Sequence, residues 1–400
     1  MDYGACRMSA IRLNTLVASE GSPVDLTVVL SAGLLLMLGL IMVTSASSEV
    51  AARNYGHPLY LAGKHVVFLG LGLAGLLGAL IVPIRVWQRL GWVLYAVSVM
   101  LLILVMMPGI GREVNGATRW IPLGFFTLQG SEFVKLFAVV FLASYLASPT
   151  ARYQERLSAY LLPLGLTGLL VGMLLLQPDF GACVVMMSAV LAMLFFAGVP
   201  MRYFLPTLFT GGLLVVVLIV LQPYRLARLI SFTDPWAHQF DGGYQLTQAL
   251  IAIGRGEWFG LGLGNSVQKL FFLPEAHTDF LFSIVVEELG IAGALLVLIG
   301  FSVLVIQGLL IGKRCYQAGF AFHGNLATGI SMLIGVQALI NLGVNLGLLP
   351  TKGLTLPFMS FGGNSLLVSL VMLGLLLRLD WECRLAPAVP KKTKVARNAK

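Results

Sequence analysis

The segment Phe272-Leu273-Pro274-Glu275-Ala276-His277-Thr278-Asp279-Phe280 marks the junction that decides the fold of this chain. A long polar insert ends here, and an apolar run longer than one membrane span begins at Phe280. Membrane proteins rarely keep ionisable groups at such a junction unless the groups have a use. We therefore take Asp279 and His277 as candidate functional residues of a membrane protein.

The composition agrees with a membrane protein. Apolar residues make up 58% of the 400 residues, charged residues make up 11%, and the mean hydropathy is +0.91. This balance is typical of polytopic membrane proteins and excludes an ordinary water-soluble domain. About ten stretches approach the ~20 residues that a transmembrane helix needs. They are Leu26–Ser45, Leu59–Val82, Gly91–Met107, Ser131–Ala147, Tyr160–Leu176, Gly181–Gly198, Tyr203–Leu221, Phe280–Ile311, Asn325–Leu348 and Leu366–Leu379. We expect an all-α polytopic membrane protein with about ten transmembrane helices.

The distribution of basic residues predicts the orientation, because cytoplasmic loops of membrane proteins carry an excess of Lys and Arg. Most of the 26 Lys and Arg residues fall on one side if both termini are cytoplasmic. These are Arg7, Arg12, Arg85, Arg89, Arg152, Arg156, Arg202, Lys313, Arg314, Arg378, Arg384, Lys391, Lys392, Lys394, Arg397 and Lys400. The same orientation leaves one large extracytoplasmic loop, about residues 222–279, between the seventh and eighth spans. The net charge of +9 reflects this asymmetry rather than nucleic-acid binding.

The chain is organised as one membrane domain with two tails. We expect a cytoplasmic N-terminal tail at 1–25, the transmembrane domain at 26–380 and a basic cytoplasmic C-terminal tail at 381–400, near anionic headgroups. The first tail has no apolar stretch, so it is not a cleaved signal. The cysteines fall in cytoplasmic or membrane-embedded segments, so no outer disulfide is expected. They are Cys6, Cys183, Cys315 and Cys383.

Two glycine-rich segments resemble nucleotide-binding patterns only superficially. Gly70–Gly75 matches G-x-G-x-x-G but lies within a span without a preceding strand, so close helix packing is the better interpretation. Gly260–Gly264 also follows no strand, and we expect a hinge or tight turn there. An amphipathic helix is predicted just before it, near Gln245–Ile253.

Several spans carry charged side chains at positions where the alternatives remain open. Glu132 and Lys135 lie one turn apart, so they form an internal salt bridge, line a substrate cavity, or do both. Asp179, in the short turn Gln177–Gly181, either caps the following helix or faces a cavity. Of Glu287 and Glu288 in the eighth span, one is expected to cap or to pair.

The ninth span and the segment after it are unusually polar. Gln337, Asn341 and Asn345 recur every four residues and form one stripe, which serves either interhelical hydrogen bonds or a polar groove. The following segment, Leu349–Ser365, predicts irregular backbone that is buried or lines a cavity. Lys352 in this segment could meet a phosphate.

Together these stretches resemble the SEDS family of bacterial envelope proteins over about Thr27–Asp380. The matching segments are Arg119-Trp120-Ile121, Gln129 with Ser131-Glu132-Phe133 and Lys135, Gln177–Gly181, Leu273–Phe280 and Leu349–Ser365. Within the family, Asn265–Leu270 and Leu349–Pro357 are similar to the cell-division branch. Three positions depart from the family pattern, namely Gly130, Phe361 and Asn364, and none of them is Asp279.

The resemblance implies a peptidoglycan glycosyltransferase that polymerises lipid II during septal cell-wall synthesis, at the outer face of the bacterial inner membrane. It places the family's essential outer-loop aspartate on Asp279. The substrate and cavity candidates are Arg119, Gln129, Glu132, Lys135, Asp179, His277, Asn345, Lys352 and Ser360. It also implies a class B penicillin-binding transpeptidase, other divisome membrane proteins and membrane lipid as partners, and no nucleic acid.

Extending a glycan from lipid II requires a sugar hydroxyl to attack an anomeric carbon that carries a lipid pyrophosphate. Asp279 is the candidate general base for an inverting displacement of undecaprenyl pyrophosphate. His277 either orients Asp279 or a substrate, or supports the loop. The leaving group needs positive charge, which Arg119, Arg225, Arg228 or Lys352 could supply. No cluster has the spacing of a dedicated metal site, although Mg²⁺ or Mn²⁺ bridging phosphate and Asp279 stays open. The competing functions are a lipid II flippase and a non-catalytic divisome scaffold.

Overall fold

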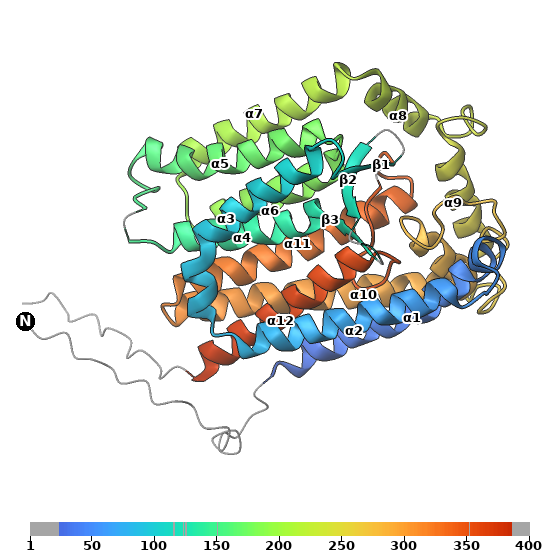
Figure 1. Ribbon diagram of the computed structural model, residues 1–400, viewed down its shortest axis with the longest axis horizontal. Helices are drawn as coiled ribbons and strands as arrows, with labels where there is room; N and C mark the ends of the chain where they lie inside the picture. Colours follow the sequence, from blue (N-terminus) through green and yellow to red (C-terminus); the bar gives the residue numbers. More distant parts are fainter. Residues whose placement is uncertain are drawn as a thin grey trace, which may run out of the picture.

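The computed structural model describes residues 24–114, 117–122, 124, 126–149, 151–351 and 353–385. Long helices run roughly alongside one another, and two shorter helices and a small sheet gather near one end of the bundle (Figure 1). The helices are α1 (Leu26–Tyr55), α2 (Tyr60–Ile81), α3 (Ile84–Met106), α4 (Gly130–Leu146), α5 (Leu157–Leu176), α6 (Phe180–Phe196), α7 (Met201–Val220), α8 (Pro223–Thr233), α9 (Tyr244–Arg255), α10 (Leu281–Gln317), α11 (Ala321–Asn345) and α12 (Gly363–Leu385). The strands are β1 (Arg112–Val114), β2 (Ala117–Pro122) and β3 (Thr127–Gln129).

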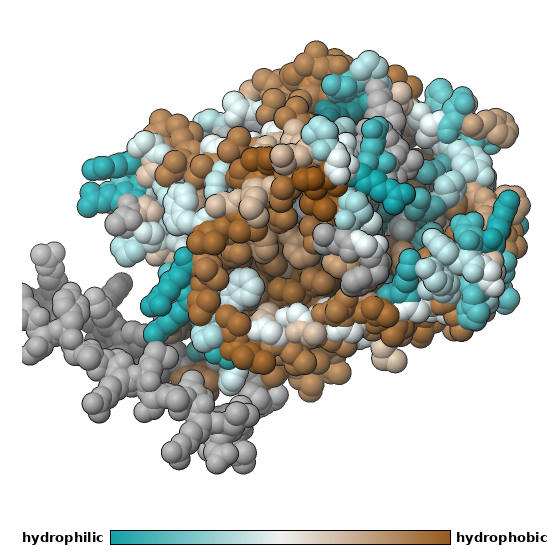
Figure 2. Space-filling model, viewed as in Figure 1, coloured by the Kyte–Doolittle hydropathy of each residue, from teal (hydrophilic) through white to brown (hydrophobic). Residues whose placement is uncertain are grey.

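Each of the predicted apolar stretches lies in a helix. Seven helices of the described chain are long and apolar enough to cross a membrane, namely α1, α2, α3, α5, α7, α10 and α11. The three other stretches lie in α4, α6 and α12. Hydrophobic side chains cover the middle of the visible face, and hydrophilic ones gather towards its two ends (Figure 2). The molecule is therefore a helical, polytopic membrane protein.

The all-α prediction needs one correction outside the helices. The segment between α3 and α4 forms an antiparallel sheet in the order β1-β2-β3, in which Trp120 pairs with both Arg112 and Gln129. Strands of three to six residues are too short to give a clear alternating pattern in the sequence. The sheet matters for the site because its middle strand carries Arg119.

Helix α11 is the most enclosed of the spanning helices. It contacts α10, α6, α4 and α12, and 72% of its most apolar window is buried. At the other extreme, α7 has no buried residue; it packs against α6 and α8 and, through Tyr203 and Thr207, against Tyr160 of α5. A helix with polar side chains can be tolerated in lipid only when other protein segments satisfy those groups, and α11 has the required surroundings.

Helix α10 is broken at Gly290, which has φ 68° and ψ −164°. The loop Glu257–Gly262 runs through this break. The amides of Leu261 and Gly262 donate to the carbonyls of Glu287 and Glu288, at 2.9 and 3.0 Å. On the other side of the break, the amides of Ile291 and Ala292 donate to the carbonyls of Glu257 and Trp258, at 2.9 and 3.2 Å. The start of the predicted turn at Gly260–Gly264, together with the residues just before it, thus supplies the hydrogen-bond partners that the interrupted helix lacks.

Both glutamates beside the break are paired, where the sequence predicted a partner for one. Glu287 accepts from the Ser266 hydroxyl and from the amides of Val267 and Gln268. Glu288 accepts from Lys269 Nζ at 3.2 Å and from the Ser45 hydroxyl at 2.6 Å. These carboxylates are fully buried, so their hydrogen bonds fix the 260–269 loop against α10.

The opposite end of the bundle is closed by ionic contacts. Arg314 at the end of α10 and Arg384 at the end of α12 both contact Asp25, which caps α1, and both contact Asp380. A disulfide joins Cys315 to Cys383 at this same end, with a Cα–Cα separation of 5.7 Å. The sequence did not predict this pairing, because the two cysteines are 68 residues apart and meet only through the packing of α10 and α12.

The break in α10 predicts that Gly290→Ala strongly lowers the stability of the folded protein. The backbone angles of Gly290 are accessible almost only to glycine, and an ideal Cβ would lie 2.5 Å from backbone atoms of Trp258, Phe259 and Gly260. We expect a loss of at least about 2 kcal/mol, measured as a lower apparent melting temperature of the purified protein. Gly168→Ala, in α5 with open space around it, is the control and should be nearly neutral. Equal melting temperatures for both variants would contradict this account of the break.

Candidate functional site

Three amide side chains on α11 hold the loops that form the candidate site. Asn345 is fully buried, and its Oδ1 accepts from the backbone amide and hydroxyl of Ser283, at 3.1 and 2.8 Å. Its Nδ2 donates to the carbonyl oxygen of Asp279 at 3.0 Å. Asn341 Nδ2 donates to the same carbonyl at 2.8 Å and to the carbonyl of Leu354 at 2.6 Å. Asn345 and Asn341 therefore fix the backbone of Asp279 at the start of α10.

The third amide connects α11 to the buried charges of α4. Gln337 Nε2 donates to the carbonyl of Thr355 at 3.0 Å, and its Oε1 accepts from Lys135 Nζ at 2.7 Å. Lys135 also donates to Glu132 at 2.8 Å, and both charged side chains are buried. The predicted internal salt bridge is present. The stripe of three amides, which we call the amide ladder, bonds to helices and loops rather than to an open groove.

Asp279 itself presents a free carboxylate. Its side chain is partly exposed and accepts no hydrogen bond from the described part of the chain, while its backbone is held by the ladder. The loop after α11 approaches closely, since an ideal Cβ on Gly353 would lie 3.2 Å from Asp279 Oδ2. A carboxylate that is attached to a fixed backbone and accepts no other hydrogen bond is suited to take up a proton.

The surroundings of Asp279 raise its pKa from 3.8 to about 7. Removal of water around the carboxyl group is the largest cause, and the nearby Glu275 carboxylate adds to it. The guanidinium groups of Arg228 and Arg119 act in the opposite direction and lower the pKa. The balance leaves a group that exchanges its proton near neutral pH.

Both of these arginines are anchored by backbone carbonyls. Arg119, on β2, donates through Nε to the carbonyl of Gln177 at 3.1 Å and through Nη2 to that of Pro178. Arg228, on α8, donates through Nη1 to the carbonyl of Thr351 at 3.1 Å. Guanidinium groups fixed in this way near a carboxyl group present the donors that bind phosphate oxygens.

The sequence did not rank the candidate cations, and the structure separates them. Arg225 stacks over the Phe180 ring at 5.0 Å and donates to the carbonyl of Leu218, so it supports α8. Lys352 lies outside the described residues. Helix α8, which places Arg228, was not predicted; its signal was Pro223 at the first helical position, followed by a strongly amphipathic sequence.

Other candidate residues hold the framework. Asp179 Oδ1 accepts from the amide of Ala182 at 3.2 Å, so it caps α6. Gln129 Nε2 donates to the Ser131 hydroxyl at 3.2 Å, where α4 begins. The Ser360 hydroxyl accepts from the amide of Leu356 at 2.9 Å and is buried. These contacts stabilise turns around the site, and none of them reaches Asp279.

His277 also contacts the loop after α11. Its carbonyl accepts from the amide of Phe361 at 2.9 Å, and its ring lies 5.6 Å from the Phe361 ring. Burial is the main factor that lowers its pKa, although the Glu275 carboxylate opposes this effect. The interpretation as a loop-supporting histidine fits these contacts. Its Nδ1 is buried without a partner in the described chain.

A cavity of about 670 Å³ lies beside the anchored Arg228. Its lining comes from α8, α9 and the loops near them: Ala227, Arg228, Ile230, Ser231, His238, Asp241, Gly242, Tyr244, Gln245, Pro274 and Thr351. Within the described residues no group of three or more His, Cys, Asp or Glu side chains could hold a metal ion.

Comparisons with known proteins place the chain in a family. A family model described as "Cell cycle protein", covering FtsW, RodA and SpoVE, matches residues 25–385. The chain belongs to the FtsW/RodA/SpoVE family. The match spans all the helices of the structure, from α1 to the end of α12.

Curated relatives are similar over most of their length. A protein of Pseudomonas fluorescens named "Probable peptidoglycan glycosyltransferase FtsW" is 50% identical over 369 residues, which cover 92% of this chain and 91% of the relative. A Coxiella burnetii protein of the same name is 50% identical over 350 residues, which cover 87% of this chain and 94% of the relative. The sequence-based resemblance to the SEDS family is thus confirmed.

Solved structures share the fold. A chain from a structure described as "Structural coordination of polymerization and crosslinking by a peptidoglycan synthase complex" matches with a TM-score of 0.73 and 31% identity, covering 91% of this chain and 99% of that chain. The crystal structure of the rod shape determining protein RodA from Thermus thermophilus matches with a TM-score of 0.66 and 30% identity. The match covers 89% of this chain and 96% of the RodA chain.

The raised pKa of Asp279 predicts a pH-dependent gain in stability for Asp279→Asn in this family member. Folding favours the protonated acid, so the carboxyl group costs stability as the pH rises from about 4 to about 7. The amide variant removes that cost. We expect a melting temperature roughly 2–5 °C above the parent at pH 8, with the difference shrinking as the pH falls below 7. Glu49→Gln, exposed on α1, is the control; a gain independent of pH would contradict the argument.

The amide ladder predicts a different outcome for Asn345→Ala. The variant removes the buried acceptor shared by the Ser283 hydroxyl and amide and one of the two side-chain donors to the Asp279 carbonyl, and it leaves a cavity at a fully buried position. We expect a loss of roughly 2–4 kcal/mol in the free energy of unfolding, seen in the melting temperature. Asn265→Ala, at an exposed position, should change little. A neutral Asn345→Ala would show that the ladder does not hold the loops.

Proposed function

We propose that this chain is a peptidoglycan glycosyltransferase that polymerises lipid II into glycan strands during septal cell-wall synthesis. The observation that carries the proposal is the Asp279 carboxylate, which accepts no hydrogen bond from the described chain, has its backbone held by the amide ladder and lies near two anchored arginines. Its pKa of about 7 suits a general base at physiological pH. The names of the curated relatives support the substrate class and the reaction.

The reaction is a single displacement with inversion at the anomeric carbon. The acceptor sugar hydroxyl forms the new glycosidic bond as its proton passes to Asp279. The bond from the anomeric carbon to the pyrophosphate oxygen breaks, and undecaprenyl pyrophosphate leaves. Arg119 and Arg228 stabilise the negative charge that develops on the leaving group. Asp279 would be the protein ligand of a divalent cation such as Mg²⁺ or Mn²⁺, which would neutralise charge on the leaving pyrophosphate.

The topology that follows has ten spans with both termini in the cytoplasm. The charged end of the bundle, with Asp25, Arg314, Asp380 and Arg384, then faces the cytoplasm. The site and the 222–279 loop face the periplasm, where lipid II presents its sugars. The segments 1–25 and 381–400 are the two cytoplasmic tails. The family described as cell cycle proteins and the FtsW relatives support the proposed location in the bacterial inner membrane at the division septum.

The chain is proposed to work with a class B penicillin-binding transpeptidase and other divisome membrane proteins. Support comes from the structural similarity to a chain of a complex whose description couples polymerisation with crosslinking. A polymerase needs such a partner because uncrosslinked strands do not form a wall.

The flippase alternative loses its main support in the structure. The intramembrane charges that suggested a transport path, Glu132 and Lys135, are buried and bonded to each other and to Gln337. Polar groups satisfied in this way stabilise helix packing and do not require a substrate path.

Reconstitution with labelled lipid II and the transpeptidase partner tests the proposal. The parent protein should give glycan chains, and Asp279→Asn should lower the polymerisation rate at least about 10²-fold while the complex still assembles. Glu49→Gln is the matched control and should polymerise like the parent. The value of kcat/KM for the parent should rise with pH and level off above about 7, because the base must be deprotonated.

Three results would count against the assignment. Normal polymerisation by Asp279→Asn would remove the aspartate from the chemistry. Movement of lipid II between leaflets without glycan formation would favour the flippase. Glycan formation that depends only on the partner would favour the scaffold.

A further inference from the structure

A second cavity, of about 790 Å³, lies at the end of the bundle opposite Asp279. Helix α3 begins at this cavity, and its other end leads to the sheet that carries Arg119. The lining comes from the start of α3, the end of α4, the following loop and α5: Arg85, Gln88, Arg89, Trp92, Ser144, Tyr145, Ala147, Ser148, Pro149, Ala151 and Leu162. Nothing in the proposed polymerisation reaction uses these residues.

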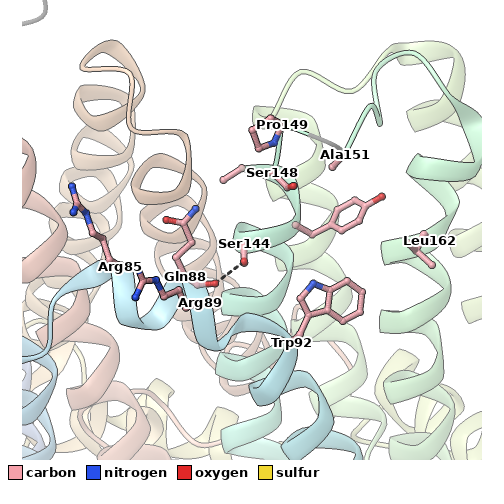
Figure 3. A pocket seen from close by; sticks show the side chains of 11 residues that line it. Arg85, Gln88, Arg89, Trp92, Ser144, Ser148, Pro149, Ala151 and Leu162 are labelled. Carbon is pink, nitrogen blue, oxygen red and sulfur yellow. Dashed lines mark hydrogen bonds between the residues drawn. The ribbon is translucent and has the colours of Figure 1, made fainter. Parts of the chain in front are cut away.

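One wall of the cavity is a single face of α3. Arg85, Gln88, Arg89 and Trp92 follow the spacing that puts side chains on one side of a helix. They run from cationic at the helix end to aromatic about two turns further along, and Figure 3 shows the first three on one side of the cavity, across from Ser148 and Pro149. Arg85 and Trp92 are separated by about 10 Å along the axis, comparable with the thickness of a headgroup layer.

The opposite wall shows the same order of polarity. Ser148 and Tyr145 lie near the end of α4, and Leu162 lies deeper, on the second turn of α5. Leu162 and Trp92 are exposed by 47% and 53% in the protein, so both face the lipid that surrounds the bundle. The Ser144 hydroxyl donates to the carbonyl of Gln88 at 2.8 Å and holds the two walls together (Figure 3).

The charge of the lining selects an anion. Two arginines face the cavity, and no acidic side chain is among the lining residues. Guanidinium groups bind phosphate oxygens with two parallel hydrogen bonds, and clusters of basic residues at helix ends attract anionic lipid. Gln88 and Ser148 supply further neutral hydrogen-bonding groups.

We propose that this cavity binds the phosphate-bearing headgroup of an anionic phospholipid, with its acyl chains along Trp92 and Leu162. A soluble phosphate would be served by the arginines alone and would not need the apolar, lipid-facing part of the cavity. The orientation proposed above assigns the lipid to the cytoplasmic leaflet. The proposal that lipid binds here does not depend on that orientation, because the cavity lies at the helix ends in either case.

The test uses the full-length protein, delipidated in neutral detergent and titrated with phosphatidylglycerol. Binding is followed by the shift in melting temperature and by native mass spectrometry. The double variant Arg85→Gln/Arg89→Gln should bind phosphatidylglycerol about 10- to 30-fold more weakly, given the contribution of each basic residue near an anionic lipid. Arg202→Gln, an exposed arginine in the first turn of α7, is the matched control and should bind like the parent.

Phosphatidylcholine with the same acyl chains should give no shift that depends on the two arginines. Equal affinity of the double variant and the parent for phosphatidylglycerol would overturn the proposal. An arginine-dependent shift of the same size with inorganic phosphate at the same concentration would also overturn it, in favour of a soluble ligand. Because the altered side chains are exposed, the variants should fold, and elution as a single species in size-exclusion chromatography checks this.

Discussion

The structure depends on the hydrogen bonds that the amide ladder of α11 makes with two irregular loops. Backbone carbonyls and amides inside a membrane protein need partners, because lipid supplies none. Gln337, Asn341 and Asn345 provide these partners for the start of α10 and for the segment Leu354–Thr355. The site can therefore contain non-helical backbone at the membrane boundary, and Asp279 can keep its carboxylate free.

The same requirement explains the break in α10. A helix interrupted in a membrane exposes carbonyls on one side and amides on the other, and the loop that carries Gly260 satisfies both sets. Buried Glu287 and Glu288 then fix the neighbouring turn. Two segments of irregular chain are thus held by polar groups on a helix.

Much of the fold could be predicted from the sequence because apolar runs report directly on membrane helices. The amphipathic helix α9 is also a local feature that spacing predicts, whereas spacing gave the bond between Glu132 and Lys135 and the cap at Asp179 only as one of two alternatives. The break at Gly290 and the choice of Arg119 and Arg228 over Arg225 were not predictable in this way. They depend on contacts between segments far apart in the chain, such as Arg119 with Gln177 and Arg228 with Thr351.

The central claim is that Asp279 and the two anchored arginines together receive the reacting end of the substrate. An experimental map of the Asp279→Asn variant bound to lipid II tests this most directly. The account predicts the pyrophosphate between the guanidinium groups of Arg119 and Arg228, with the anomeric carbon facing residue 279. A pyrophosphate bound elsewhere, with residue 279 out of reach of the sugar, would contradict it.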